Sequence, residues 1–367
     1  MSERIFFGMA SVFFGICLLV SVFAARAPKE NILKRRRRVR CRRCLKWGMT
    51  AAGIFLLVWA VAGYMEGNRR ILDSEQNSLE ICTNTIRSDI DKALSVSMDE
   101  LRACADWGHW KETMDHMGIS YSEISPEFVN ELASETSFDT FCIVDGQGND
   151  CKGDGSTEDM NEFGFVKEGL EGRGGISILR HKNDGKQVFN FYLPVISSDT
   201  GTEKVEAIVR GECSVEYYLQ PYLSPLGSYS WSDTDLFFCN GDGTMLTGSR
   251  DYSYEGELTT ALFYKGRIDQ EMKSDADLVF NRMGDSTSTL VKNSKDIING
   301  ICAARLDSCD CVLVSVRHKF ERSFRQNVAT AICFAVLGGF HIATAVLCRS
   351  LARRRDGLLE EEELKQW

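Results

Sequence analysis

The sequence has little proline and little histidine, and it lacks the short motifs of the common hydrolases and nucleotide-binding proteins. It contains 5 prolines and 5 histidines in 367 residues. It has no His-Glu-x-x-His, no Gly-x-Ser-x-Gly and no phosphate-binding loop. Aspartate and glutamate are abundant but follow no catalytic spacing. We therefore expect no enzyme activity, no catalytic residues and no cofactor.

Metal-ligand patterns are equally sparse. His109 and His116 share one face of a helix but need a third ligand. Cys41 and Cys44 form one Cys-x-x-Cys pair, with no second pair or histidine nearby to complete a zinc site. We expect no metal site.

Long apolar runs are present, and they are almost free of charge. Three of them have about 20 residues, the length of a helix that spans a bilayer: Ile5 to Ala25, Trp47 to Met65 and Val328 to Cys348. The first could be a signal peptide, but the positive charge follows it instead of preceding it. We expect three membrane helices, with the first retained.

Basic residues flank these runs on one side and predict the topology. Residues 26–46 hold 11 Lys or Arg and one acid, and Arg349, Arg353, Arg354 and Arg355 follow the last run. Short basic segments stay in the cytoplasm. The N-terminus and residues 66–327 are therefore expected outside a cell membrane, and the C-terminus inside. The basic loop is also positioned to contact membrane lipid.

The charge of the expected exterior excludes one class of partner. The whole chain has a net charge of −9, but residues 66–327 hold 26 basic and 45 acidic residues. Nucleic acid needs a basic surface, so no nucleic-acid partner is expected. An acidic exterior slightly favours cationic ligands and keeps the domain soluble.

Cysteine usage leaves two interpretations open. Nine of the 14 cysteines fall in the expected exterior. A disulfide between Cys142 and Cys151 is conceivable because the pair would face across a hairpin. The alternative is a set of buried free thiols in a reducing habitat.

A helical stalk is expected at residues 66 to about 117, as one long helix or two stacked helices. Leu72, Leu79, Ile86 and Ile90 begin a stripe of apolar residues at helical spacing, and no proline occurs between Pro28 and Pro126. Such a stalk can pair with a second copy, which predicts a homodimer. Trp107 and Trp110 end the apolar face, where they form either the floor of a ligand pocket or ordinary core packing.

Strand-forming runs follow the stalk. An apolar run at 138–145, a turn at 146–149, a helix at 162–172 and further apolar runs at 187–196 and 205–212 predict a small antiparallel sheet with one face able to hold a ligand. Residues 236–246 repeat the plan of apolar strand, Gly-rich turn and return strand. This repeat suggests two similar modules in tandem.

The stretches Phe141 to Gly148, Phe165 to Gly172, Tyr192 to Val195 and Ala207 to Glu212 resemble the double Cache sensor region of bacterial transmembrane receptors, over roughly residues 66–325. The resemblance implies an α+β fold with two PAS-like antiparallel-sheet modules on a long helix. It also implies a dimer that binds a small molecule and signals through its last membrane helix. Asp106 to Trp110 is also similar to a motif of the CHASE4 sensor domain.

The sequence departs from the amino-acid-binding members of that family. They carry an arginine just before the helix that starts near Phe165, where this chain has Asp159 to Glu162 and no arginine. The carboxylate clamp of those members is therefore not supported. The candidate ligand-binding residues are Trp107, Trp110, Asp154, Phe163, Arg180, Asn190, Tyr192 and Glu212.

We expect this chain to be a transmembrane sensor for a small extracellular ligand. The alternative is a membrane-anchored interaction or scaffold protein without such a ligand. After the last span the chain resembles the first turns of a signalling coiled coil and has no kinase, cyclase or chemotaxis module. We therefore expect either that the chain is truncated or that it signals through a separate cytoplasmic partner. The expected parts are membrane helix 1–25, basic loop 26–46, membrane helix 47–65, stalk 66–125, membrane-distal module 126–214, membrane-proximal module 215–327, membrane helix 328–348 and coiled-coil stub 349–367.

Overall fold

The computed structural model describes residues 32–119, 124–180, 186–197, 203–223, 234–241, 243–248, 256–264, 270, 273–275, 277, 287–294, 297–320 and 322–364. The chain divides into two units, Leu72–Phe320 and the combination of Met1–Ile71 with Glu321–Trp367. Each unit is considered by itself. The membrane helix expected at residues 1–25 lies outside the described residues.

The second of these units is built from two long helices. Helix α2 covers Ile32–Cys104 and helix α9 covers Arg322–Leu364. Both are long and apolar enough to cross a membrane, within the described part of the chain. The basic segment that was expected to be a loop is helical from Ile32 onward.

Small residues let these two helices approach closely. A Cβ atom added at Gly53 would lie 2.8 Å from the carbonyl oxygen of Gly338, and the reverse is also true. Such small-residue contacts are typical of helices packed in a bilayer. Asn327 donates a hydrogen bond to Asn68 at 3.3 Å. Large apolar side chains point outward from both helices, which suits contact with lipid; examples are Phe55, Val58, Trp59, Val336 and Phe340.

The end of α2 is specified locally. Asp106 caps the next helix, α3 (Trp107–Met117), by accepting a hydrogen bond from the His109 amide at 2.9 Å. Gly118 ends α3 with φ of 69°, a left-handed conformation that favours glycine. Helix α4 (Pro126–Ser134) begins in the same way, with Ser125 as its cap and proline at its first position. The expected stalk is therefore α2 followed by the separate helix α3.

The first sheet has six strands, all paired antiparallel, in the order β3-β2-β1-β6-β5-β4. Helix α5 (Gly164–Leu170) lies between β3 and β4 in the chain and packs on β5 and β6. The strand bounds are β1 Thr140–Asp145, β2 Asn149–Lys152, β3 Thr157–Asp159, β4 Gly175–Arg180, β5 Gln187–Ser197 and β6 Lys204–Ser214.

The second sheet has five strands in the order β8-β7-β11-β10-β9, again all antiparallel. In both sheets the first strand lies between the second strand and the last strand. The remaining bounds are α6 Val215–Leu223, β7 Thr234–Asn240, β8 Met245–Gly248, α7 Leu258–Tyr264, β9 Ser288–Ser294, β10 Ile297–Arg305 and β11 Cys311–Phe320.

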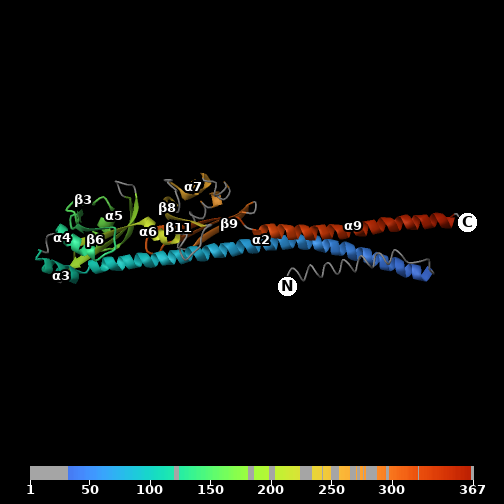
Figure 1. Cartoon of the computed structure of the whole chain (residues 1–367), viewed down its shortest axis with the longest axis horizontal. Coiled ribbons are helices and arrows are strands. Elements are labelled where there is room, and N and C mark those ends of the chain that lie inside the picture. The colour runs from blue at the N-terminus through green and yellow to red at the C-terminus, as the bar shows by residue number, and fades with distance from the viewer. Residues whose placement is uncertain are drawn as a thin grey trace. The chain divides into compact units, whose positions relative to one another are not determined.

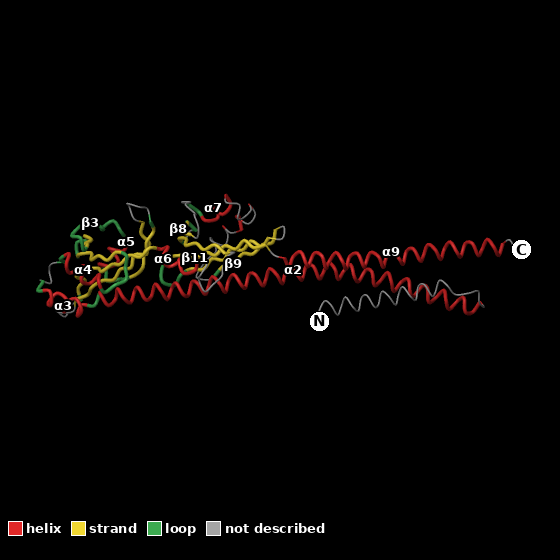
Figure 2. Tube along the Cα trace, in the orientation of Figure 1, coloured by secondary structure: helices red, strands yellow, loops and turns green. Residues whose placement is uncertain are grey.

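One core joins both sheets to α2. Within the unit 72–320, the sheets lie along the same side of this helix (Figures 1 and 2). Leu79, Ile86, Ile90, Leu94 and Leu101 are at most 1% exposed, so most of the apolar stripe of the helix is buried. It packs with helices α3 and α4, one face of the first sheet and part of the second sheet. The chain is thus α+β, with a long N-terminal helix and two antiparallel sheets.

The conceivable disulfide between Cys142 and Cys151 is absent, and the register explains why. Cys151 lies opposite Ile143, so its side chain points to the face of the sheet that Cys142 does not occupy. Both cysteines are free, as are the other cysteines whose side chains are described.

Asp91 of α2 holds the turn between β10 and β11. Its carboxylate accepts hydrogen bonds from the Asp307 amide at 3.0 Å, the Ser308 amide at 3.1 Å and the Ser308 hydroxyl at 2.8 Å. Arg87, one turn earlier, donates to the Arg305 carbonyl at 3.3 Å. The turn is therefore fixed to the helix by a charged acceptor.

We expect Asp91→Ala to lower the free energy of unfolding of the unit 72–320 by about 2 kcal/mol, because hydrogen bonds to a charged group contribute about 1.5–3 kcal/mol. Urea unfolding of the full chain in detergent, followed by tryptophan fluorescence, measures the change. Lys92→Ala is the control, since Lys92 is an exposed neighbour on the same helix. Equal losses in the two variants would contradict the role given to Asp91.

Candidate functional site

The face of the first sheet that does not pack on α2 carries a group of polar side chains. Asn190 lies opposite Glu212, and Tyr192 lies opposite Arg210. Directly opposed residues of an antiparallel pair point to the same face. Arg210 also lies opposite Cys142 of β1, which places β1 residues on this face as well. We call Asp150, Asn190, Arg210 and Glu212 the polar cluster.

Arg210 stands at the centre of the polar cluster and is enclosed by two carboxylates. Its guanidinium donates to Glu212, and its Nε lies 3.5 Å from Oδ1 of Asp150. The exposed fractions of Arg210, Asp150 and Glu212 are 4%, 0% and 4%. The ring of Phe165 from α5 lies 5.7 Å from the guanidinium carbon. The polar cluster therefore encloses one basic side chain between two acidic side chains.

Several atoms of the polar cluster are buried without a hydrogen-bond partner among the described residues. They are both carboxylate oxygens of Asp150, Oδ1 of Asn190, and Nε and Nη1 of Arg210. Asn190 itself is fully buried and uses only its Nδ2, which donates to the Ser177 hydroxyl at 3.1 Å. Buried polar atoms in proteins are nearly always paired, so a concentration of exceptions indicates a place for water or a ligand.

Tyr192 borders the polar cluster and has a fixed role as a donor. Its hydroxyl donates to the carboxylate of Glu168 on α5. Gly175, opposite Tyr192 on β4, has no side chain there, and an added Cβ would lie 3.0 Å from the tyrosine hydroxyl. Burial and then the hydrogen bond to Glu168 raise the pKa of Tyr192 to about 12. The hydroxyl therefore stays protonated at neutral pH.

Burial also governs the ionisation of the polar cluster. It raises the pKa of Asp150, while Arg210 acts in the opposite direction. Burial alone would lower the pKa of Arg210, but the charges of Asp150 and Glu212 raise it above its ordinary value. Arg210 is therefore charged, and its charge keeps its neighbours from being uncompensated anions.

The structure brings only some of the sequence candidates together. Asn190, Tyr192 and Glu212 lie side by side on the outer face, and Phe163 packs with Phe165 beside them at 5.9 Å. Trp107 and Trp110 pack into the core shared with α2, on the other face of the sheet. Trp110 is 2% exposed and donates to the Cys104 carbonyl at 2.6 Å. Asp154 and Arg180 are exposed.

The sequence analysis missed Asp150, Arg210 and Glu168. A signal for Arg210 was present, because it alternates with Ile208 and Glu212 in the buried part of its strand. Two charges at a spacing of two residues in a buried strand must share one face and need compensation. Glu168, on a short helix with an exposed side, carried no such signal.

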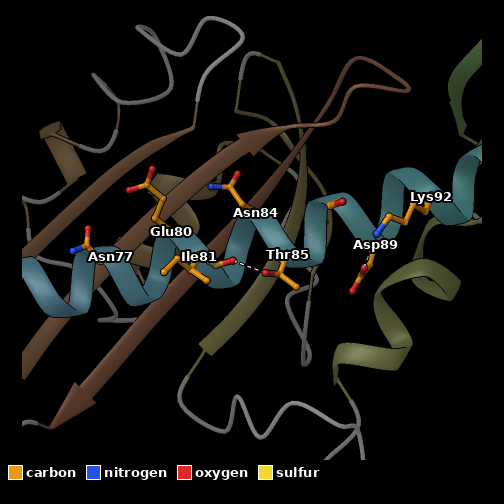
Figure 3. A pocket seen from close by; sticks show the side chains of 8 residues that line it. Asn77, Glu80, Ile81, Asn84, Thr85, Asp89 and Lys92 are labelled. Atoms are coloured by element: carbon orange, nitrogen blue, oxygen red, sulfur yellow. Dashed lines mark hydrogen bonds and ion pairs between the residues drawn. The ribbon is translucent and has the colours of Figure 1, made fainter.

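A separate groove of about 690 Å³ lies along α2 (Figure 3). Thr85 donates to the Ile81 carbonyl at 2.8 Å on its floor. The side chains that line it belong to α2 and are mostly polar: Asn77, Glu80, Ile81, Asn84, Thr85, Ser88, Asp89 and Lys92. None of them belongs to the polar cluster.

Structural neighbours of the chain are extracellular sensory domains of chemoreceptors and histidine kinases, the kind of protein that the sequence resembles. The sensory domain of the Campylobacter jejuni chemoreceptor Tlp1 is 8% identical, with a TM-score of 0.44, over 69% of this chain and 98% of that one. The ligand-binding domain of Pseudomonas fluorescens CtaA, solved with L-isoleucine, is 13% identical, with a TM-score of 0.45, over 71% and 98%. Neither protein-family models nor curated proteins match the sequence.

Proposed function

We propose that the chain is a membrane-anchored sensor whose first sheet binds a small polar ligand at the polar cluster. The observation that carries this proposal is the set of buried atoms on Asp150, Asn190 and Arg210 that make no hydrogen bond, although Arg210 and Asp150 form an ion pair. A sheet face that was only structural would be expected to pair them or to replace them with apolar side chains, because unpaired buried groups each cost about 1–3 kcal/mol. A ligand that pairs them recovers this free energy on binding.

The charges of the polar cluster favour one kind of ligand. Arg210 is already matched by two carboxylates, so it is a poor site for a further carboxylate. The carboxylate of Asp150 and Oδ1 of Asn190 accept no hydrogen bond and can therefore take N–H or O–H donors. A small molecule with a protonated amine or several hydroxyls supplies such donors.

The remaining parts of the proposal concern the arrangement of the receptor. In both sheets the first strand lies between the second and the last strand, which supports two tandem PAS-like modules. The outward-facing apolar side chains of α2 and α9 support two membrane spans, and the basic residues at their ends support a cytoplasmic C-terminus. Helix α2 is continuous from the basic segment to the first sheet, which supports a route for the signal along this helix. The proposed signalling unit is a homodimer.

A thermal-shift screen of the full chain in detergent against small amines, polyols and amino acids tests the proposal. A ligand at a hundredfold excess over its Kd adds about 2.7 kcal/mol to the stability of the folded state. For a unit of this size this corresponds to about 5–10 °C. We expect amines or polyols to give such a shift and simple carboxylates to give none.

The matched variants are Asn190→Leu and Arg180→Ala. Asn190→Leu removes an acceptor of the polar cluster in nearly the same volume, so it is expected to abolish the shift while changing the basal stability by less than about 1 kcal/mol. Arg180→Ala lies on the same sheet but is exposed, and is expected to keep the shift. A ligand whose shift survives Asn190→Leu binds elsewhere, which would refute the assignment of the site.

A further inference from the structure

The turn between β10 and β11 contains two cysteines that the proposed sensor function does not use. Cys309 is half-buried and Cys311 is fully buried, and Asp310 separates them. The two thiols are within hydrogen-bond reach of each other. The same turn is the one that Asp91 holds against α2.

The backbone of this turn places the two cysteines at a distance suited to a disulfide. The Cys311 amide donates to the Cys309 carbonyl at 2.8 Å, which is a three-residue γ-turn. Fully extended, residues two apart in sequence are separated by about 6.6–7.2 Å. A γ-turn shortens this separation into the range of about 4.4–6.8 Å between Cα atoms in which disulfides form.

The other cysteines near this turn do not compete for the bond. Cys239 lies on β7 opposite Val312, so its thiol points to the other face of the second sheet from Cys311. Cys82 and Cys302 lie near each other, since Cys302 contributes to the raised pKa of Cys82. Both are at most 1% exposed, so a dissolved reagent does not reach them. Cys309 and Cys311 lie next to each other, and the thiol of Cys309 is partly accessible to solvent.

We propose that Cys309 and Cys311 form a dithiol site that reacts with small-molecule disulfides. The Cys309 thiolate attacks one sulfur of the disulfide, forms a mixed disulfide and releases one thiolate. Cys311 then loses its proton and attacks Cys309 Sγ, which forms the Cys309–Cys311 bond and releases the second thiolate. The two protein thiols lose two electrons and two protons, and the small disulfide gains them as two thiols.

The order of attack follows from exposure and ionisation. Cys309 is the thiol that solvent reaches. The hydrogen bond with Cys309 and then burial raise the pKa of Cys311 well above its ordinary value, so Cys311 stays a thiol until the mixed disulfide has formed. Both steps need a thiolate, so the overall reaction is expected to accelerate as the pH rises.

Because Asp91 and Arg87 hold this turn, a bond formed there acts next to α2. A disulfide would add a covalent bond to the γ-turn that already exists with both thiols free. The site therefore gives the redox state of the exterior a physical connection to the same helix that the ligand-binding sheet packs on.

The test is mass spectrometry of the full chain in detergent after incubation with oxidised glutathione and alkylation of the remaining thiols. The peptide that contains Cys309 and Cys311 is expected to lose two hydrogens, to escape alkylation and to recover both thiols on reduction. Cys309→Ser is expected to abolish the modification of this peptide. Cys311→Ser is expected to leave a glutathione adduct on Cys309.

Cys302→Ser is the matched control, since it removes a buried thiol from the same sheet and is expected to keep the Cys309–Cys311 bond. Thermal unfolding shows whether each variant remains folded. Three results for the folded wild-type chain would show that the proposal is wrong. Both thiols could stay free and become alkylated, the peptide could carry only a stable glutathione adduct, or Cys309 or Cys311 could be linked to another cysteine.

Discussion

Replacing Arg210 with alanine is expected to lower the free energy of unfolding of the unit 72–320 by about 3–5 kcal/mol. This is the cost of removing one partner from a buried ion pair, because the carboxylates that remain are uncompensated. Asp150 and Glu212 are 0% and 4% exposed, so water does not replace the lost guanidinium. The substitution also removes the guanidinium that lies over the Phe165 ring.

Urea unfolding of the full chain in detergent, followed by tryptophan fluorescence, measures this effect. The control is Arg180→Ala, an exposed arginine on the same sheet, for which a change within about 0.5 kcal/mol is expected. Replacing Asp150, Arg210 and Glu212 together with apolar residues of similar volume is expected to restore most of the loss. A loss below about 1 kcal/mol in the single variant would show that the three charges are not held together as described.

Phe189→Ala is expected to have an effect of similar size, about 3–5 kcal/mol, for a different reason. Phe189 of β5 is fully buried, and its ring meets Tyr218 of α6 at 5.3 Å and Phe238 of β7 at 5.7 Å, both edge to face. Since β5 belongs to the first sheet and β7 to the second, this ring is part of the core that joins the two sheets. Its removal leaves a cavity where the sheets meet.

The consequence of Phe189→Ala extends beyond stability. We expect the wild-type unit to unfold in one step and the two sheets of this variant to unfold in separate steps. The reason is that cooperative unfolding depends on the contacts that connect the parts of a unit. Hydrogen exchange of peptides from β6 and β10 measures each sheet separately. Phe163→Ala, which removes a half-buried ring from the outer face, is the control and is expected to keep one step. Single-step unfolding of Phe189→Ala would contradict the joining role.

The elements that were predicted well have strong local patterns. The apolar runs at 138–145, 187–196 and 205–212 correspond to β1, β5 and β6, and the turn at 146–149 lies between β1 and β2. The break between α2 and α3 was not assigned to a residue, because no proline or glycine marks it. The break depends on Asp106, whose side chain accepts the hydrogen bond from the His109 amide. This capping role is recognised only in the folded structure.

The candidate site was predicted less completely, because its members come from strands that are far apart in sequence. Asn190, Tyr192 and Glu212 were found because polar residues in apolar runs are conspicuous. Asp150 was missed, since a residue next to a tight turn is ordinarily on the surface. Trp110 was chosen as a ligand-binding candidate because aromatic side chains are common in pockets. Its side chain lies instead in the core, because α3 packs against α4 and β5, and the sequence does not reveal this packing.

Hydrogen exchange of the full chain in detergent, with and without a ligand identified by thermal shift, tests the central claim most directly. The account predicts slower exchange in peptides of β5 and β6, which carry Asn190, Arg210 and Glu212, and little change in β9 and β10 of the second sheet. Slower exchange confined to the second sheet or to the α2 groove at residues 77–92 would contradict it. A folded chain that binds none of the amines, polyols or amino acids would instead favour a protein-binding scaffold.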